Sequence, residues 1–333
     1  MLPTTWRSRA LPSPSTRETP VSGHGDSSGA TLVAPSLLRE WPLPAPGEDK
    51  YSRGSVLVVG GARATPGAAL LAGVSALRAG AGKLTLAVAG SVAVQLGVAV
   101  PECGAIGLPE TPGGSVKPEL DGISSYLDRA DTLLVGPGLD DPDLAVELLQ
   151  AMLEREVRRD GDGNSEGAAG DEEGPAVVLD AYALGALVQL EDQLAPWRGR
   201  LILTPNPKEA AILLGRDVED LEKDLAEISA RFDAVVSCQG LITQPPGLNP
   251  DEPALWKITT GYGGLGTSGS GDVLAGTIAG LRARGTTGAQ AACWGTHLHA
   301  AAGDRLASRL GPLGFLAREL ADELPALMLE LGV

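Results

Sequence analysis

Short, uniformly apolar runs alternate with segments of helical pattern along most of the chain. The run SVLVV at 55–59 and the run TLLV at 132–135 lack the polar alternation of a half-exposed strand, which indicates strands buried on both faces. The other predicted strands are 83–88, 176–180, 201–204, 234–237, 241–244 and 256–260. The predicted helices are 67–79, 143–157, 271–283, 288–306 and 315–331, with further helical patterns after 176–180 and 201–204.

This alternation predicts an α/β fold in which helices cover both faces of a mostly parallel sheet. No repeat with a period of roughly 20–50 residues is visible, so we expect one domain over residues 31–333. In such sheets, ligands bind beyond the carboxyl ends of the strands. Predicted strands end here in loops of unusual composition at Gly60-Gly61, Gly136-Pro137-Gly138, Asp180 and Thr204-Pro205-Asn206.

Three segments have the composition of loops. Residues 1–30 are rich in Ser, Pro, Thr and Gly, and we expect a disordered tail. Residues 158–175 carry Asp and Glu and almost nothing to bury, which predicts a solvated acidic loop inserted between core elements. Residues 245–253 are predicted to form a short loop.

The charge balance of the chain disfavours nucleic acids and anionic membranes as partners. The chain has 42 acidic and 26 basic residues and a formal charge of -16, which repels nucleic acids and anionic membranes. An anionic ligand must therefore be bound by a local device such as backbone N–H groups. No apolar run reaches the roughly 18 residues of a membrane helix, so we expect no membrane contact and a cytoplasmic location.

The cysteines and histidines give no sign of a metal centre. Cys103, Cys238 and Cys293 are far apart, which favours buried thiols in a reducing compartment over a disulfide framework or a zinc site. His297 and His299 lie two positions apart on a predicted helix, so they face different sides and cannot chelate one ion together. A structural role is expected for both.

The segment GGLGTSGSGD at 263–272 carries the strongest chemical signal. Its glycines allow successive N–H groups to point at one ligand, and the helix start adds unpaired donors and the positive end of a dipole. We predict a phosphate site at Gly269, Ser270 and Gly271, with Asp272 placed to take a proton from an attacking hydroxyl. The alternative is a loop that allows close helix packing, with Asp272 as a helix cap.

Two other glycine motifs fit this segment poorly. A dinucleotide-binding G-x-G-x-x-G motif requires an acidic residue roughly 20 positions later, and none occurs between Asp272 and Asp304. A P-loop requires a lysine after its glycines, and this run contains none.

The strand end at 204–209 supplies a second candidate element. Asn206 and Glu209 stand three residues apart, which suits ordering of water around Mg²⁺ and equally suits a capping box at a helix start. Both interpretations remain open. The loop at 60–68 permits close approach of a large ligand, although an ordinary turn has the same composition, and Asp180 is interpreted as a buried helix cap.

Several motifs together resemble one known family. GTSGSGDVLAG at 266–276 resembles the C-terminal signature of the NAD(P)H-hydrate dehydratases, a carbohydrate-kinase-like branch of the ribokinase-like superfamily. Residues 55–88 resemble the first motif of that family, and the segments LLVGPGL (133–139), VLDAYAL (178–184), LTPNPKEAAILLG (203–215) and HLHAAAGD (297–304) follow in its order. The resemblance covers about residues 31–333 and implies a ribokinase-like, three-layer α/β/α fold.

The resemblance implies a metabolite-repair lyase. A nucleotide, ADP or ATP, would phosphorylate the hydroxyl of hydrated NADH or NADPH with the help of Mg²⁺, and phosphate would then leave to restore the dihydronicotinamide. Family members are often tetrameric, so a homo-oligomer is expected. The alternatives are a small-molecule kinase of the same superfamily, which stops at a phosphate ester of a sugar or vitamin precursor, and a nucleotide-binding regulatory protein without turnover.

Matching positions give the site residues that the resemblance implies. Asp272 would be the catalytic base and contact the hydrate, together with Ala68, Gly138 and Asn206. The nucleotide would contact Gly269, Ser270, Gly271, Cys238, Gln239 and Gly240, and Glu209 would serve the metal. This chain departs from the family in having Asn206 where His is common and in lacking the Lys of a Lys-Gly pair near Gly240. Asn206 and Glu209 match the Mg²⁺-phosphate motif of sugar kinases instead.

Overall fold

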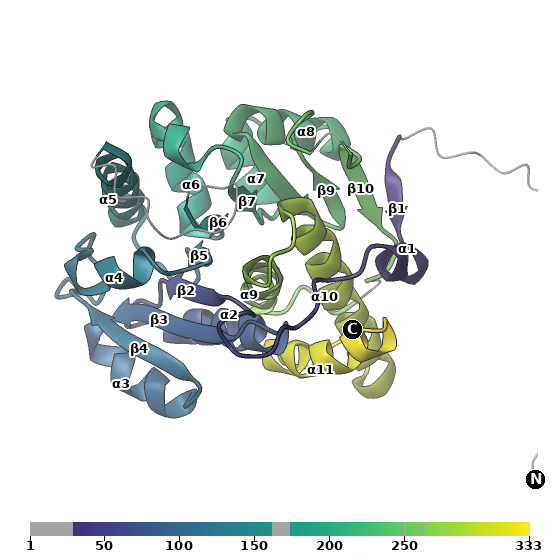
Figure 1. Ribbon diagram of the computed structural model, residues 1–333, viewed down its shortest axis with the longest axis horizontal. Helices are drawn as coiled ribbons and strands as arrows, with labels where there is room; N and C mark the ends of the chain where they lie inside the picture. The colour runs from purple at the N-terminus through teal and green to yellow at the C-terminus, as the bar shows by residue number, and fades with distance from the viewer. Residues whose placement is uncertain (1–28, 162–173, 250, 262) are drawn as a thin grey trace, which may run out of the picture.

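The computed structural model describes residues 29–161, 174–249, 251–261 and 263–333 (Figure 1). Within them, one ten-stranded sheet has the order β1-β10-β9-β8-β7-β6-β5-β2-β3-β4. Every strand pair is parallel except the two that β9 makes with β8 and β10. The strands are β1 (Thr31–Val33), β2 (Ser55–Val59), β3 (Lys83–Ala89), β4 (Cys103–Leu108), β5 (Thr132–Val135), β6 (Ala176–Leu179), β7 (Leu201–Leu203), β8 (Ala234–Cys238), β9 (Leu241–Thr243) and β10 (Leu255–Ile258).

Helices cover both faces of the sheet, as the three-layer prediction requires. They are α1 (Pro35–Glu40), α2 (Pro66–Arg78), α3 (Gly90–Ala99), α4 (Ser124–Leu127), α5 (Pro142–Gly161), α6 (Tyr182–Gln189), α7 (Pro207–Leu214), α8 (Leu221–Phe232), α9 (Ser270–Ala283), α10 (Gly288–Leu310) and α11 (Ala317–Glu330). Figure 1 shows α5, α6, α7 and α8 grouped on one side of the sheet and α2, α9, α10 and α11 on the other.

Alternate side chains of each strand feed the two cores. Val56 and Val58 of β2 pack with the α2, α9, α10 and α11 layer, whereas Leu57 and Val59 pack with the opposite layer. Because both faces are buried, the strands carry no polar alternation, which explains why uniform apolar runs predicted them correctly.

Small residues bring α2 and α9 into close contact. A Cβ added at Gly276 or Gly280 of α9 would collide with the backbone carbonyls of Ala72 and Ala76 on α2. These residues recur every four positions, so they form matching stripes on the two helices. The close packing fixes the position of α9, and with it the start of that helix.

The structure corrects some sequence predictions. Helix α5 continues to Gly161, so the first four residues of the predicted acidic loop 158–175 are helical, and residues 162–173 lie outside the described part of the chain. The predicted tail 1–30 also lies outside it, except for Gly29 and Ala30. The short elements β1, α1 and α4, and the α3–β4 unit, were not predicted. Among the described residues, no helix is long and apolar enough to span a membrane.

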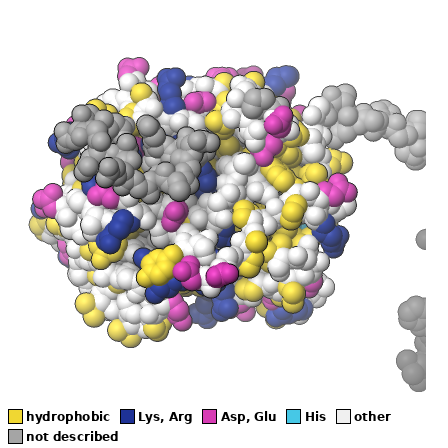
Figure 2. Space-filling model, viewed as in Figure 1, with side chains coloured by type: hydrophobic (Ala, Val, Ile, Leu, Met, Phe, Trp, Pro, Cys, Tyr) yellow, Lys and Arg dark blue, Asp and Glu magenta, His cyan; other side chains and the backbone are white. Residues whose placement is uncertain are grey.

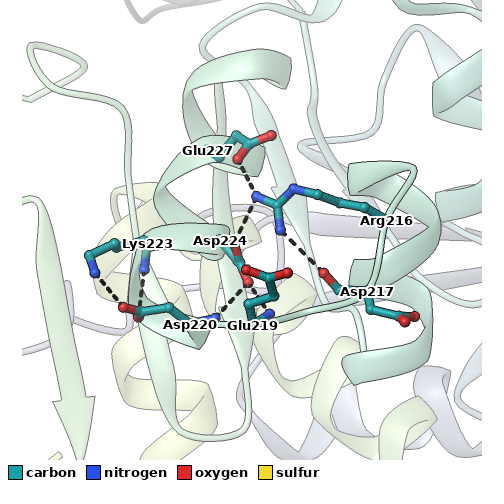
Figure 3. Close-up of polar contacts among 7 residues, drawn as sticks. All are labelled: Arg216, Asp217, Glu219, Asp220, Lys223, Asp224 and Glu227. Atoms are coloured by element: carbon teal, nitrogen blue, oxygen red, sulfur yellow. Dashed lines mark hydrogen bonds and ion pairs between the residues drawn. The ribbon is translucent and has the colours of Figure 1, made fainter.

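A network of ion pairs at the α7–α8 junction connects the loop after α7 to α8 (Figure 3). Arg216 donates hydrogen bonds to Asp224, at 2.8 Å, and to Glu227. The second oxygen of Asp224 accepts the backbone N–H groups of Glu219 and Asp220 at 2.7 and 3.0 Å. These partners hold the pKa of Asp224 below its usual value, with the Arg216 hydrogen bond as the main cause.

Candidate functional site

The loops that follow β2 and β5 are joined by backbone hydrogen bonds. The N–H of Gly61 donates to the carbonyl of Pro137, and the N–H of Ala62 donates to that of Gly138, both at 2.8 Å. Gly138 has φ +77°, and a Cβ there would collide with the carbonyl of Thr65. Because Ala68 lies in the first turn of α2, directly after this loop, the structure brings the predicted substrate positions Ala68 and Gly138 to the same edge of the sheet.

The loop after β6 packs against the same edge. Gly136 has φ +126°, and a Cβ there would collide with the backbone carbonyl of Asp180. The next residue, Ala181, has φ +51°, a backbone conformation that L-residues rarely adopt and that costs on the order of 1–3 kcal/mol. Strain of this kind is typical of functional sites, because the surrounding structure must hold the residue in place.

Asp180 is a buried carboxylate at this edge. Its side chain is 6% exposed, and its Oδ1 accepts a hydrogen bond of 2.9 Å from the Thr204 hydroxyl. The pKa of Asp180 is raised to about 7, mainly by burial and in addition by the charges of Asp272 and Glu209. The N-cap of α6 is Ala181, so the interpretation of Asp180 as a helix cap was wrong. Its electrostatic interaction with Asp272 and Glu209 depends on the packing of segments far apart in the sequence, and no local signal in the sequence reveals it.

The start of α9 differs from those of the neighbouring helices because its N-cap, Gly269, has no side chain. Gly269 has φ +88°, and a Cβ there would collide with Leu71 of α2. Close packing therefore explains this glycine, as the packing alternative proposed. The exposed Gly271 and the half-buried Asp272 follow in the first turn, where backbone N–H groups lack helical partners.

Asp272 is not the helix cap that the packing alternative assumed, because it lies three residues inside the helix from the N-cap. Burial alone raises the pKa of Asp272 to about 6. The carboxylate is therefore mostly ionised at neutral pH, yet basic enough to accept a proton. Unpaired N–H donors and a carboxylate in one helical turn can bind a phosphoryl group and deprotonate its acceptor.

The start of α7 forms a complete capping box, which confirms that reading of Asn206 and Glu209. The side chain of Asn206 accepts the N–H groups of Lys208 and Glu209 at 2.9 and 3.1 Å, and Glu209 Oε2 accepts the N–H of Asn206 at 2.8 Å. Burial raises the pKa of Glu209. In the described part of the chain, no three His, Cys, Asp or Glu side chains are arranged to hold a metal ion.

Cys238, Gln239 and Gly240 form the tight connection between β8 and β9. Gln239 and Gly240 have φ +47° and +81°, the backbone signature of a two-residue type I′ hairpin, which accounts for the glycine. Cys238 is 2% exposed, and burial raises the pKa of its thiol to about 12. Its side chain is therefore a neutral core residue, and the predicted nucleotide contact is confined to its backbone and to the next two residues.

Both histidines of α10 are buried, in keeping with structural roles. The ring Nε2 of His299 lies 2.8 Å from the hydroxyl of Ser270, the first residue of α9. Burial lowers the pKa of both imidazoles, that of His299 to about 4, so both rings are neutral at pH 7. The sequence separation of 29 residues hides the His299–Ser270 hydrogen bond from pattern analysis.

Comparison with known proteins points to one family. The family model for NAD(P)H-hydrate dehydratase matches residues 56–326. The chain is 40% identical, over 300 residues, to the ADP-dependent (S)-NAD(P)H-hydrate dehydratase of Xanthomonas campestris, and the match covers 89% of this chain and 95% of that protein. It is 38% identical to the bifunctional NAD(P)H-hydrate repair enzyme Nnr of Moorella thermoacetica over 82% of this chain, and spans about half (48%) of that relative's length.

A solved structure agrees with this result. The ADP/ATP-dependent NAD(P)H-hydrate dehydratase of Bacillus subtilis, crystallised with ATP and Mg²⁺, superimposes with a TM-score of 0.66 at 25% identity. The match covers 92% of this chain and all of the other. The fold is therefore the ribokinase-like three-layer α/β/α fold.

Proposed function

Because the chain belongs to the NAD(P)H-hydrate dehydratase family, we propose that it dehydrates hydrated NADH or NADPH at the expense of a nucleoside phosphate, with Asp272 as the base. It is accordingly a nucleotide-dependent hydro-lyase that acts in metabolite repair. The observation that supports this assignment best is the uncapped start of α9, which places backbone donors and the Asp272 carboxylate in the same turn.

In the first step, the ring hydroxyl of the hydrate attacks the terminal phosphorus of the nucleotide. An O–P bond forms, the bond to the remaining nucleotide breaks, and the hydroxyl proton moves to Asp272. The N–H groups at Gly271 and Asp272 stabilise the charge on the transferring oxygens, as preorganised donors do in phosphoryl transfer.

In the second step, the phosphate leaves the ring carbon with the electron pair of the C–O bond. The proton of the adjacent ring carbon passes to the departing phosphate, and its C–H electrons form the double bond of the dihydronicotinamide. Phosphorylation converts hydroxide, a poor leaving group, into phosphate, a good one. The net change is loss of water from the hydrate and cleavage of one nucleotide phosphoryl bond.

Mg²⁺ fits this site in partnership with nucleotide phosphates. Protein-bound Mg²⁺ commonly takes one or two carboxylates, substrate phosphates and several waters, so a closed cage of protein ligands is not required. Glu209, whose Oε2 is used by the capping box, is the residue that we propose to hold the ion, directly or through water. The ion would neutralise charge on the transferring phosphate.

The remaining predicted contacts complete the proposal. The hydrate would lie against Ala68, Gly138 and Asn206, and the nucleotide against Gly269, Ser270, Gly271 and the hairpin of Cys238, Gln239 and Gly240. ADP is the donor named for the Xanthomonas relative, and ATP remains an alternative donor for this chain. The cytoplasmic location remains a prediction.

A homo-oligomer, with a tetramer expected, is also part of the proposal. Val94 and Val98 lie one turn apart on α3 and are each 76% exposed. Figure 2 shows hydrophobic side chains on the surface at the lower left, where Figure 1 places α3. Light scattering on purified protein would test the proposal, since a monomer at micromolar concentration would contradict it.

One assay separates the dehydratase from the kinase alternative. Hydrated NADH is mixed with the protein, Mg²⁺ and ADP or ATP, and the near-ultraviolet absorbance of the dihydronicotinamide is followed. Return of that absorbance with release of inorganic phosphate is the expected result. A stable phosphorylated alcohol formed from a sugar or vitamin precursor, with no return of absorbance from the hydrate, would favour the kinase.

A further inference from the structure

Helix α10 makes one hydrogen bond to Gly261, two residues before the glycine-rich segment 263–272, and one to Ser270 within that segment. Before the segment, Asp304 Oδ2 accepts the backbone N–H of Gly261 at 2.8 Å. Within the segment, the ring of His299 and the hydroxyl of Ser270 form the 2.8 Å hydrogen bond described above. The two α10 residues are five positions apart, so adjacent turns of one helix hold Gly261, just before the segment, and Ser270 within it.

The same helix provides a close-fitting surface between these two bonds. A Cβ added at Gly303 would lie 2.6 Å from a methyl group of Leu265, and a Cβ added at Gly261 would lie 3.0 Å from that of Ala300. Small residues on α10 therefore allow the segment to lie directly on the helix. Since glycine-rich backbone loses much conformational entropy on ordering, an external support is needed to keep it in one conformation.

The His299–Ser270 pair is placed to act on structure and not on substrate. The two residues are 7% and 4% exposed, and the Ser270 hydroxyl bonds to His299, so the proposed contact of Ser270 with the nucleotide is confined to its backbone. Burial lowers the pKa of His299 to about 4, and the hydrogen bond therefore joins two neutral groups at pH 7. Ser270 is only two residues before Asp272, so its anchoring orients the first turn of α9.

We propose that His299 is a positioning residue for phosphoryl transfer: through Ser270 it fixes the N–H groups and the Asp272 carboxylate at the start of α9, while Asp304 holds Gly261, two residues before the segment. This inference rests on the proposed function for its kinetic consequence. Donors aimed at a transferring phosphate accelerate the reaction only when their position is set before the substrate binds. Misplacement by about 1 Å can cost roughly 100-fold in rate.

Four variants test the hydrogen bond. Ser270→Ala and His299→Leu each remove it, and both should lower kcat by about 10- to 100-fold with a smaller change in KM for the nucleotide. The double variant should be no slower than the slower single variant, because both changes remove the same interaction. His299→Gln, which keeps a polar group, should recover part of the lost rate.

Thr296→Val provides a matched control on the same helix. Thr296 makes a buried hydrogen bond of the same length, 2.8 Å, to Ser237 of β8, away from the glycine-rich segment. This control should lower the melting temperature without lowering kcat. Equal losses of kcat in Thr296→Val and His299→Leu would overturn the inference, because general destabilisation would then explain both.

Amide hydrogen exchange tests the structural role of the His299–Ser270 hydrogen bond without requiring turnover. Ser270→Ala should speed exchange in residues 263–273 and leave the sheet strands unchanged, whether or not the protein accepts the hydrate as substrate. Unchanged exchange in that segment would refute the positioning role even if kcat fell. Absence of hydrate turnover in the wild type, with faster exchange in the variant, would refute the proposed function. The structural role of the His299–Ser270 hydrogen bond would still hold.

Discussion

Two groups of carboxylates in this molecule have opposite electrostatic surroundings. At the α7–α8 junction, Asp224 is paired with Arg216 and with backbone N–H groups, and its pKa is lowered (Figure 3). At the carboxyl edge of the sheet, Asp180, Glu209 and Asp272 all have raised pKa values, with burial as the main cause. For Asp180, the charges of Asp272 and Glu209 come next after burial.

The comparison separates carboxylates that stabilise the fold from those that serve a reaction. A paired carboxylate stabilises the folded state when ionised, whereas a buried one without a cation destabilises it. Groups with raised pKa values at a strand edge are typical of functional sites, where proton transfer is needed near neutral pH. When ionised, the three carboxylates at the sheet edge therefore lower the stability of the folded state, whereas Asp224 at the α7–α8 junction raises it.

The largest effect is expected from neutralising Asp272. Asp272→Asn keeps the shape of the side chain and removes the proton acceptor, so kcat for the hydrate should fall by a factor on the order of 10²–10⁴. Nucleotide binding, followed by calorimetry, should be largely retained. A loss of less than a few-fold would show that Asp272 is not the base and that a regulatory nucleotide-binding protein fits better.

Neutralising Asp180 should raise stability in a pH-dependent way. Its folded pKa of about 7 lies above its ordinary value of 3.8, so wild-type stability is full below about pH 4 and decreases as pH rises towards 7. Asp180→Asn lacks this penalty and can still accept the Thr204 hydrogen bond. The gain in free energy of unfolding at pH 8, relative to pH 4, should be on the order of 4 kcal/mol, since one pKa unit corresponds to about 1.4 kcal/mol.

Urea unfolding of both proteins at pH 4, 6 and 8 measures this difference. Because all other carboxylates are common to the two proteins, the pH dependence of the difference isolates Asp180 and its immediate neighbours. A difference that stays constant from pH 4 to pH 8 would show that Asp180 is not an uncompensated charge.

A smaller effect is expected from Glu209→Gln, which separates the capping role of Glu209 from its proposed metal-binding role. Glu209→Gln retains a capping-box side chain but removes the charge, so the melting temperature should change little. If Glu209 holds Mg²⁺, the Mg²⁺ concentration for half-maximal rate should rise by about tenfold or more. An unchanged Mg²⁺ dependence would leave Glu209 with the capping role alone.

The smallest effect on turnover is expected at the paired cluster. Asp224→Asn weakens the Arg216 ion pair and the hydrogen bonds from Glu219 and Asp220, so the melting temperature should fall by a few degrees. Calorimetric scans and the hydrate assay on the same sample would measure both properties. A large loss of kcat at unchanged melting temperature would contradict the division between the two clusters.

The sequence predicted the layered fold because buried parallel strands are apolar at every position. It missed β4 and α3, where small residues such as Gly104 and Gly107 weaken the strand pattern and where Val94 and Val98 are exposed on the helix. Element ends were displaced by a few residues, as at α5, whose charged last turn resembles a loop in composition.

The candidate site was only partly predictable for a related reason. The glycine-rich segment and Asp272 are adjacent in sequence, so their chemistry is visible in one motif. Asp180 follows β6, whereas Thr204 and Glu209 follow β7, and only the parallel pairing of β6 with β7 brings Asp180 and Thr204 together. The support of Ser270 by His299 depends on the packing of two helices and has no local sequence pattern.

A structure of the chain with ADP or ATP and Mg²⁺ tests the central claim most directly. The account predicts that a terminal phosphate oxygen accepts hydrogen bonds from the N–H groups of Gly271 and Asp272, with the Asp272 carboxylate facing the position of the attacking hydroxyl. A nucleotide bound elsewhere, with the start of α9 free of phosphate and the Asp272 side chain turned away from it, would contradict the account.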